Sequence, residues 1–274
     1  MLEVAKIKIK VNELYVEADS NDTAFSIRNK YKKDSDVIVL NGFQIKEDVP
    51  LKEADRVTLI KKGEIPTEKE LENLMIARHT PGVFEKLKKS KVGVAGAGGL
   101  GSNIAISLAR MGVGEIVICD YDVVEPSNLN RQQYFIDDIG KLKVEAIRDI
   151  LKKINPFMNI TIHKLYLDKS NIKSVFNDCN IILEAFDCPI CKSTLSNEVL
   201  TKMKDTYLIA SSGMAGYYSS NLIQTKKITS KFYLCGDGVN GAKEGSGLMA
   251  PRVAICANHM VNMVVRILCE EIDV

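Results

Sequence analysis

The stretch from residue 91 to residue 120 constrains the fold most, because it places a run of glycines between two apolar segments. Residues 92–95 and 116–119 are short and apolar, as is typical of buried parallel strands. The glycine run at 96–101 precedes residues 103–111, whose apolar spacing predicts a helix. Glycines let a backbone turn tightly and approach an anion, and a helix N-terminus offers free N–H groups. The sequence therefore predicts a phosphate-binding β-α-β unit.

Two features of this unit supply the first candidate ligand-binding residues. The glycines that would approach a phosphate are Gly96, Gly98, Gly99 and Gly101. Asp120 ends the second apolar segment, close to where such units carry an acid that binds ribose. The alternative is a glycine turn that only packs the helix on the strand. The motif does not decide which nucleotide binds.

Length and composition indicate the class of protein. A chain of 274 residues can form one large domain, or a moderate domain with a small one. Its net charge of +2 gives no reason to expect binding to nucleic acid or to a membrane, and no apolar run approaches the roughly 18–20 residues that span a bilayer. Seven cysteines, mostly in apolar segments, and a start without signal-peptide character favour a soluble cytoplasmic protein.

The first 62 residues predict a small domain of their own. The expected elements are strands over 4–11 and 14–18, a helix around 25–31, and strands over 37–40 and 56–61. This order in about sixty residues describes a β-grasp.

This segment resembles the small sulfur-carrier proteins of the ThiS/MoaD type, especially at residues 39–42 and 55–60. Those carriers end in a flexible Gly-Gly whose carboxylate is the reactive group. Here Gly63 is followed by Glu64-Ile65-Pro66, so the resemblance implies no free carboxylate. We expect residues 1–62 to be a docking or regulatory module, with a purely structural appendage as the alternative. Residues 63–66 would be a linker to a second domain over 67–274.

The second domain should contain a mostly parallel sheet with an antiparallel extension. Outside the β-α-β unit we expect helices over 67–78, 83–89, 141–154, 188–203 and 249–271, strands over 160–165, 180–185 and 207–210, and an antiparallel pair over 217–224 and 228–234. Thr67 and Glu70 have the spacing of a capping box at the first of these helices.

The run from Asp120 to Gln132 resembles the ThiF/MoeB family of E1-like adenylating enzymes, whose hallmark is D-x-D-x-V-x-x-S-N-L-x-R-Q. Further matching blocks lie at 140–145, 154–156, 184–187 and 247–251, and the resemblance covers about residues 78–268. It implies a Rossmann-like domain that uses ATP to adenylate the C-terminal glycine of a separate ThiS-like carrier ending in Gly-Gly. A sulfur donor would later convert that product to a thiocarboxylate. Thiamine biosynthesis is favoured over molybdopterin synthesis.

The resemblance also assigns roles to individual residues. It assigns the nucleotide to Asp120, Asp122, Asn128, Arg131 and Lys143, with the last two as cations on the triphosphate. It makes Asp187 the Mg²⁺ ligand, and Arg78 the arginine that reaches the partner's ATP in a homodimer. The alternatives are surface charges for Arg78, Arg131 and Lys143, Lys141 in place of Lys143, and a helix N-cap for Asp187.

The cysteines depart from the family pattern. Many relatives bind zinc through two C-x₂-C pairs, but Cys188-Pro189-Ile190-Cys191 is the only such pair here, so we expect no zinc site. Residues 236–247 contain no cysteine that could link covalently to the carrier. We expect Cys188, at a predicted helix start, to be a packed cysteine, with a thiol of lowered pKa as the alternative.

Two other functions stay open. A dinucleotide-dependent oxidoreductase would share the glycines and Asp120, but not the Ser-Asn-Leu-x-Arg-Gln run. A non-catalytic scaffold could keep the fold while its own β-grasp occupies the carrier groove. Intact Arg131, Lys143 and Asp187 argue against the scaffold.

Overall fold

The computed structural model describes residues 5–274 and divides the chain into two compact units, the first ending at Pro81 and the second spanning Gly82–Val274. By its contacts, the helix α2 (Glu68–Ile76) groups with the first unit. The division into 1–62, 63–66 and 67–274 stays a prediction. Each unit is described by itself.

The first unit is a five-stranded sheet that carries one helix, in the order β2-β1-β5-β3-β4. Its elements are β1 (Lys6–Val11), β2 (Leu14–Asp19), α1 (Ala24–Tyr31), β3 (Val37–Leu40), β4 (Phe43–Ile45) and β5 (Arg56–Ile60). The central strands β1 and β5 run parallel, and the other pairs are antiparallel. Ala24 and Ile27 of α1 pack with Ile9 in the core. The predicted order of elements is found.

One strand of this unit was not expected. β4 pairs with β3 across a tight turn at Asn41 and Gly42, whose φ angles are 50° and 90°. Asn-Gly with two positive φ angles is typical of a two-residue hairpin. The expected elements included no strand between residues 40 and 56, so this hairpin was missed.

The helix α2 begins with the predicted capping box. The Thr67 side chain accepts a hydrogen bond from the Glu70 backbone N–H, and the Glu70 carboxylate accepts one from the Thr67 N–H. These bonds satisfy two N–H groups that have no partner within the helix. The capping box is therefore confirmed.

The second unit has a seven-stranded sheet in the order β11-β12-β10-β9-β6-β7-β8. Its strands are β6 (Lys91–Ala95), β7 (Glu115–Cys119), β8 (Asn159–His163), β9 (Ile181–Glu184), β10 (Tyr207–Ser211), β11 (Gln224–Thr229) and β12 (Phe232–Gly236). Only the edge strand β11 is antiparallel to its neighbour, as far as the described residues extend. The predicted α/β class, with a mostly parallel sheet and an antiparallel extension, is confirmed.

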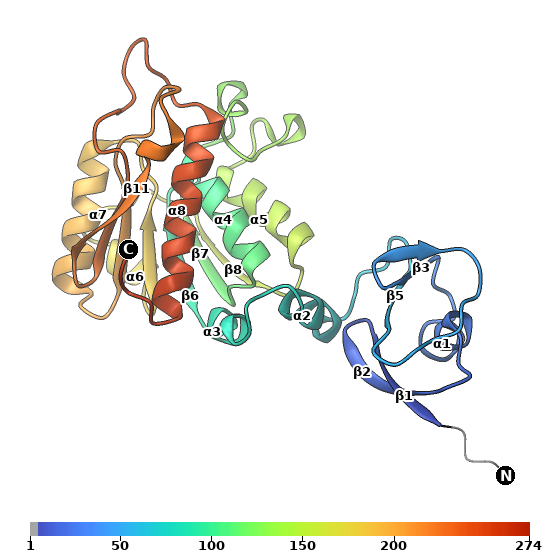
Figure 1. Ribbon diagram of the computed structural model, residues 1–274. Coiled ribbons are helices and arrows are strands. Elements are labelled where there is room, and N and C mark those ends of the chain that lie inside the picture. The colour runs from blue at the N-terminus through green and yellow to red at the C-terminus, as the bar shows by residue number, and fades with distance from the viewer. Residues whose placement is uncertain (1–4) are drawn as a thin grey trace. The chain divides into compact units, whose positions relative to one another are not determined.

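Helices cover both faces of this sheet (Figure 1). One face carries α3 (Val83–Lys88), α4 (Gly99–Met111), α5 (Lys143–Ile154) and α8 (Ala250–Leu268), and the other carries α6 (Ile172–Val175) and α7 (Pro189–Lys202). The central strands β6, β7 and β9 are almost wholly buried, which explains why they are apolar on both faces. No helix within residues 5–274 has the length and apolar character needed to cross a membrane.

The predicted antiparallel pair was misplaced. The structure has it at β11 and β12, and residues 217–223 form a loop with a short 3₁₀ turn at Ser220–Leu222. Tyr217 and Tyr218 suggested a strand because aromatic residues favour strands. Instead they lie in the loop, 91% and 53% exposed, and stack on each other.

The order of the strands decides where a ligand can bind. β6 lies between β7 and β9, and the chain leaves it towards β7 through α4. The chain segments that follow β6 and β9 therefore lead to different sides of the sheet and leave a crevice at their carboxyl ends. Open α/β sheets bind ligands at such a switch point.

Candidate functional site

A cavity of about 610 Å³ lies at the carboxyl ends of β6, β7, β9 and β10. The predicted site residues that line it are Gly96, Gly98, Gly99, Asp120, Asp122, Asn128, Arg131, Lys143 and Asp187. They come from four segments that are far apart in the sequence. The structure thus brings most of the predicted site into one cavity.

The glycine turn forms the floor of the cavity at the start of α4. Gly96 has φ +103°, and a Cβ atom there would lie 2.9 Å from the Ala185 carbonyl oxygen. A Cβ atom at Gly101, in the first turn of α4, would lie only 1.9 Å from the Gly96 carbonyl oxygen. The turn therefore closes tightly on the helix, and it leaves the free N–H groups of α4 at the cavity.

Gly101→Ala should destabilise the second unit. The added methyl group would overlap a backbone oxygen that cannot rotate away, so we expect the free energy of unfolding to fall by about 1–3 kcal/mol. Gly98→Ala is the matched control, because a Cβ atom there would meet nothing closer than Gln132 Nε2 at 3.9 Å. Thermal unfolding of both variants measures this, and an equal effect of the two would contradict the steric argument.

Asp120 ties the glycine turn to the end of β7. Its carboxylate accepts hydrogen bonds from the backbone N–H groups of Ala97, at 2.6 Å, and Asp122, at 2.8 Å. Burial raises the pKa of Asp120, although these two hydrogen bonds oppose the increase. Each oxygen keeps a lone pair for a further donor, which suits the predicted contact with ribose.

Lys143 lies in the cavity wall as the first residue of α5. Its side chain is 9% exposed, and its Nζ atom lies 2.8 Å from the Asp122 carboxylate. The neighbouring Lys141 instead forms an ion pair with Asp138 and is largely exposed. The structure therefore places Lys143, and not Lys141, among the residues that line the cavity.

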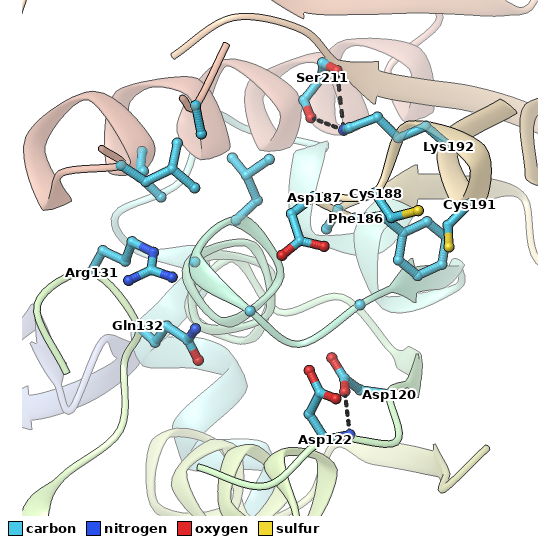
Figure 2. Close-up of a pocket in the computed structure, with 18 of the residues that line it drawn as sticks. Asp120, Asp122, Arg131, Gln132, Phe186, Asp187, Cys188, Cys191, Lys192 and Ser211 are labelled. Atoms are coloured by element: carbon cyan, nitrogen blue, oxygen red, sulfur yellow. Dashed lines mark hydrogen bonds between the residues drawn. The ribbon is translucent and has the colours of Figure 1, made fainter. Parts of the chain in front are cut away.

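The segment after β7 brings the polar side chains of Asn128, Arg131 and Gln132 to the cavity, and Figure 2 shows the last two. Asn128 is buried and accepts a hydrogen bond from the Glu125 N–H, and Arg131 donates to the Ser127 carbonyl oxygen at 3.2 Å. Within residues 5–274, Arg131 Nε and Gln132 Oε1 are buried without a hydrogen-bond partner. Such atoms are costly unless a ligand or water satisfies them. Gln132 had been quoted only as part of the family run and had been given no role.

Asp187 follows β9, and its carboxylate is exposed at the cavity (Figure 2). It forms no hydrogen bond or ion pair with the other residues from 5 to 274. The alternative of a helix N-cap is wrong, because Cys188 occupies the N-cap of α7 and no side chain caps that helix. An unpaired carboxylate at a polar cavity is free to bind a cation.

A buried ion pair beside Asp187 was not found from the sequence. Glu184, 1% exposed at the end of β9, accepts both from Lys192 Nζ of α7, at 3.0 Å, and from the Phe186 N–H, at 2.7 Å. Lys192 also donates to the Ser211 side chain at 3.0 Å and lines the cavity. Burial raises the pKa of Glu184, and the Lys192 charge opposes that shift. The pair fixes the start of the segment that carries Asp187.

The cysteines fall into two groups. Burial raises the pKa of the thiols of Cys119, Cys179 and Cys256 to about 12, and of Cys235 to about 11. Cys188 is half-buried at the cavity, and hydrogen bonds from Cys191 and Ile190 lower its pKa. The expected packed cysteine is therefore wrong for Cys188, which fits the alternative of a thiol of lowered pKa.

Two further predictions concern a zinc site and Arg78. No group of three His, Cys, Asp or Glu side chains within residues 5–274 could hold a metal ion by itself. The absence of zinc stays a prediction. Arg78 lies exposed in the turn after α2, within the first unit, and its role stays a prediction as well.

Comparison with protein families gives two matches. The model described as ThiF family matches residues 71–274, and the model described as ThiS-like ubiquitin matches residues 7–63. Among curated proteins, the adenylyltransferase and sulfurtransferase UBA4 of Candida glabrata is 39% identical over 140 residues, which are 50% of this chain and 32% of that protein. The probable adenylyltransferase/sulfurtransferase MoeZ of Mycobacterium tuberculosis is 41% identical over 104 residues, 38% of this chain and 26% of that protein. The chain thus spans about a third or less of these two relatives.

Solved structures share the fold of the second unit. The E. coli tRNA N6-threonylcarbamoyladenosine dehydratase TcdA, in complex with AMP, has a TM-score of 0.65 at 20% identity, covering 72% of this chain and 93% of that chain. E. coli MccB with ATP has a TM-score of 0.53 at 27% identity, covering 69% of this chain and 59% of that chain. The first likeness shows the fold alone.

Proposed function

Because this chain belongs to the ThiF family, we propose that it uses ATP to adenylate the C-terminal glycine carboxylate of a separate ubiquitin-like sulfur carrier. The products would be the carrier acyl-adenylate and pyrophosphate. The relatives named adenylyltransferase/sulfurtransferase support this reaction class, and the complex of MccB with ATP supports the choice of nucleotide.

One observation carries the proposal. A glycine turn at a helix N-terminus, the cations Arg131 and Lys143 and the unpaired carboxylate of Asp187 border the same cavity. Two polar atoms of its wall, Arg131 Nε and Gln132 Oε1, have no partner in the described chain. A volume of about 610 Å³ is in the range of nucleotide-sized ligands. The triphosphate would lie against the N–H groups of α4, with Arg131 and Lys143 on its oxygens.

The chemistry requires positioning and neutralisation of charge. A carrier carboxylate attacks the α-phosphate, so two anions must be brought together. Lys143 is already held by Asp122, and Arg131 has a free Nε, so both cations are placed before the substrate arrives. Asp120 would hold the ribose through its remaining lone pairs.

Asp187 fits the role of a Mg²⁺ ligand. Mg²⁺ is commonly bound by one or two carboxylates together with substrate phosphates, and Asp187 is an unpaired carboxylate beside the phosphate-binding turn. The ion would neutralise charge on the triphosphate. The buried Glu184–Lys192 pair would keep Asp187 in place during the reaction.

Exchange of radioactive pyrophosphate into ATP tests the proposal. We expect exchange that depends on Mg²⁺ and on an added ThiS-type carrier ending in Gly-Gly. The matched control is the same carrier without its last two glycines, which should support no exchange. Absence of exchange with every Gly-Gly carrier tested, together with hydride transfer to or from a nicotinamide nucleotide, would favour the oxidoreductase alternative.

The identity of the carrier would decide the biosynthetic pathway in which the protein acts. The ThiS-like first unit favours a thiamine-type carrier over a molybdopterin-type one. Parallel exchange assays with the two carriers separate them by their specificity constants. In the first unit, Gly63 continues into Glu64 and α2, so this unit has no terminal carboxylate of its own at that point. Its docking or regulatory role stays a prediction.

Arg78 is proposed to act on the partner's nucleotide in a homodimer. Mixing inactive Arg78→Ala chains with inactive Asp187→Ala chains should then restore about a quarter of wild-type exchange, because half of the dimers are mixed and each carries one native site. Subunit exchange is verified by native mass spectrometry with one chain isotopically labelled. If mixed dimers form and stay inactive, Arg78 does not act across the interface.

A further inference from the structure

The first turn of α7 carries two cysteines in the wall of the cavity. Cys188 is the N-cap residue, Pro189 is the first residue of the helix, and Cys191 lies in the same turn. Both cysteines line the cavity next to Asp187 (Figure 2). The adenylation reaction has no use for a pair of thiols at this position. From this geometry we propose that Cys188 and Cys191 are a redox-active dithiol that closes to a disulfide by exchange with low-molecular-weight disulfides.

The backbone suits closure of the disulfide. A disulfide requires Cβ atoms roughly 3.5–4.5 Å apart. Two residues three apart within a regular helix have Cβ atoms about 5–6 Å apart, but Cys188 is the N-cap residue and is not held in the helical conformation. Cys188 has extended backbone angles, φ −79° and ψ 119°, and Pro189 fixes the first helical residue. A small change in the backbone angles of Cys188, together with rotation of both side chains about χ1, would therefore bring the two sulfurs together, and no strand has to move.

Cys188 and Cys191 differ from the other cysteines in the access that solvent has to their thiols. Cys188 and Cys191 are half-buried at an open cavity, whereas Cys119, Cys179, Cys235 and Cys256 are buried. Cys269 is half-buried, but it lies alone at the end of α8. The Cys191 sulfur is also 3.3 Å from the hydroxyl of Tyr166, which is 52% exposed. Only the α7 pair combines access from solvent with a second thiol one turn away.

The exchange proceeds in two steps that balance. The Cys188 thiolate attacks one sulfur of glutathione disulfide, forms a mixed disulfide and releases one glutathione thiolate. The Cys191 thiolate then attacks the Cys188 sulfur, which forms the Cys188–Cys191 disulfide and releases the second glutathione thiolate. The two protons of the cysteine thiols pass to the released glutathiones. The protein loses two electrons, and one glutathione disulfide is reduced.

The position of the two thiols would couple their oxidation to the binding of the nucleotide. This part of the inference rests on the proposed function. Both thiols share the cavity with Asp187, where the metal and the triphosphate would bind. Bound Mg²⁺·ATP would cover the cysteines and slow their oxidation. By linkage, oxidation would then change the affinity for ATP by the same factor by which ATP changes the tendency to oxidise.

The experiment treats the full chain with glutathione disulfide and follows the products by intact mass and peptide mapping. Wild type should lose two thiols and yield a peptide pair linked through Cys188 and Cys191. Cys191→Ser should stop at a stable glutathione adduct on Cys188. Cys188→Ser, which keeps the accessible Cys191 thiol, should form no intramolecular disulfide, and Cys269 is the internal control for the reaction of a single half-buried thiol. Circular dichroism of each variant establishes that it is folded.

The proposal is overturned if folded wild type retains both thiols in excess glutathione disulfide, or if the Cys191→Ser adduct maps to Cys269 and not to Cys188. Repeating the oxidation with saturating Mg²⁺·ATP, with binding measured separately by equilibrium dialysis, tests the coupling. Slower oxidation of the pair with unchanged Cys269 supports it. Measured ATP binding without protection rejects the coupling, and absence of ATP binding rejects the proposed function while the disulfide result stands.

Discussion

Asp187→Ala should lower the rate of ATP–pyrophosphate exchange by at least about 100-fold while the protein stays folded, since removal of one preorganised electrostatic group typically costs 10²–10³ in rate. The carboxylate is exposed at the cavity and makes no hydrogen bond or ion pair within residues 5–274, so its loss removes no contact that holds the fold. Initial rates of exchange and a thermal melt measure the two effects. Asp187→Asn, which keeps the size and removes the charge, should lose nearly as much activity.

Asp205→Ala is the matched control. Asp205 is a fully exposed carboxylate in the turn before β10, at the end of the strands away from the cavity, and it forms an ion pair with the surface lysine Lys231. Both activity and melting temperature should be unchanged in this variant. Near-normal exchange by a folded Asp187→Ala protein would mean that the metal and the triphosphate are held elsewhere.

Arg252→Met should cause the largest loss of stability, about 3–5 kcal/mol, because it leaves the buried carboxylate of Asp237 without its cation. Both side chains of this ion pair are only 4% exposed. Arg252 also donates to the carbonyl oxygens of Tyr218 and Ser219, at 2.9 and 2.7 Å, and these would lose their donor. We expect the melting temperature of the second unit to fall by about 6–20 °C.

Two comparisons check this explanation. Asp205→Ala, which opens an exposed ion pair, should leave the melting temperature unchanged. The double variant Arg252→Met with Asp237→Leu should recover part of the loss, because it leaves no unpaired charge. A double variant that is less stable than Arg252→Met alone would show that Asp237 supports the fold chiefly through its hydrogen bonds to the loop at Val239 and Asn240.

The Arg252–Asp237 ion pair also predicts that the stability of the second unit depends on pH. Burial alone would raise the pKa of Asp237, but hydrogen bonds from Asn240 and Val239 and the charge of Arg252 hold this pKa below its ordinary value. A carboxyl whose pKa is lowered in the folded state adds stability above its unfolded value of about 3.9 and loses it as the pH falls through the folded value. Wild type should therefore lose this contribution below about pH 4. Melting curves from pH 7 to pH 3 measure it.

The sequence predicted the residues around the cavity well because they follow the ends of parallel strands. Gly96, Asp120 and Asp187 each come directly after a short apolar segment, and the carboxyl ends of parallel strands meet at one edge of the sheet. Alternation and apolar runs likewise predicted most strands. The positions of these residues therefore followed from topology, although their roles in catalysis stay a proposal.

The features that were not predicted from the sequence depend on contacts between residues far apart in the chain, and the spacing of residues along the sequence does not reveal such contacts. Glu184 ends an apolar strand, and a charge there needs a buried partner, yet nothing in the sequence identifies Lys192 as that partner. Tyr217 was expected in a strand because its propensity favours one, whereas its exposure of 91% shows that no neighbouring strand covers it. Side-chain burial decided both cases, and burial is a property of the whole fold.

The order of the elements along the chain also determines when each unit can fold during synthesis. The sheet of the first unit is complete once residue 60 has been made. In the second unit, α4 ends at residue 111 and packs against α8, which begins at residue 250. At about 5–20 residues per second, the apolar side of α4 waits roughly 7–30 s for its cover. We therefore expect the nascent second unit to expose an apolar surface to which chaperones could bind, while the first unit can already be native.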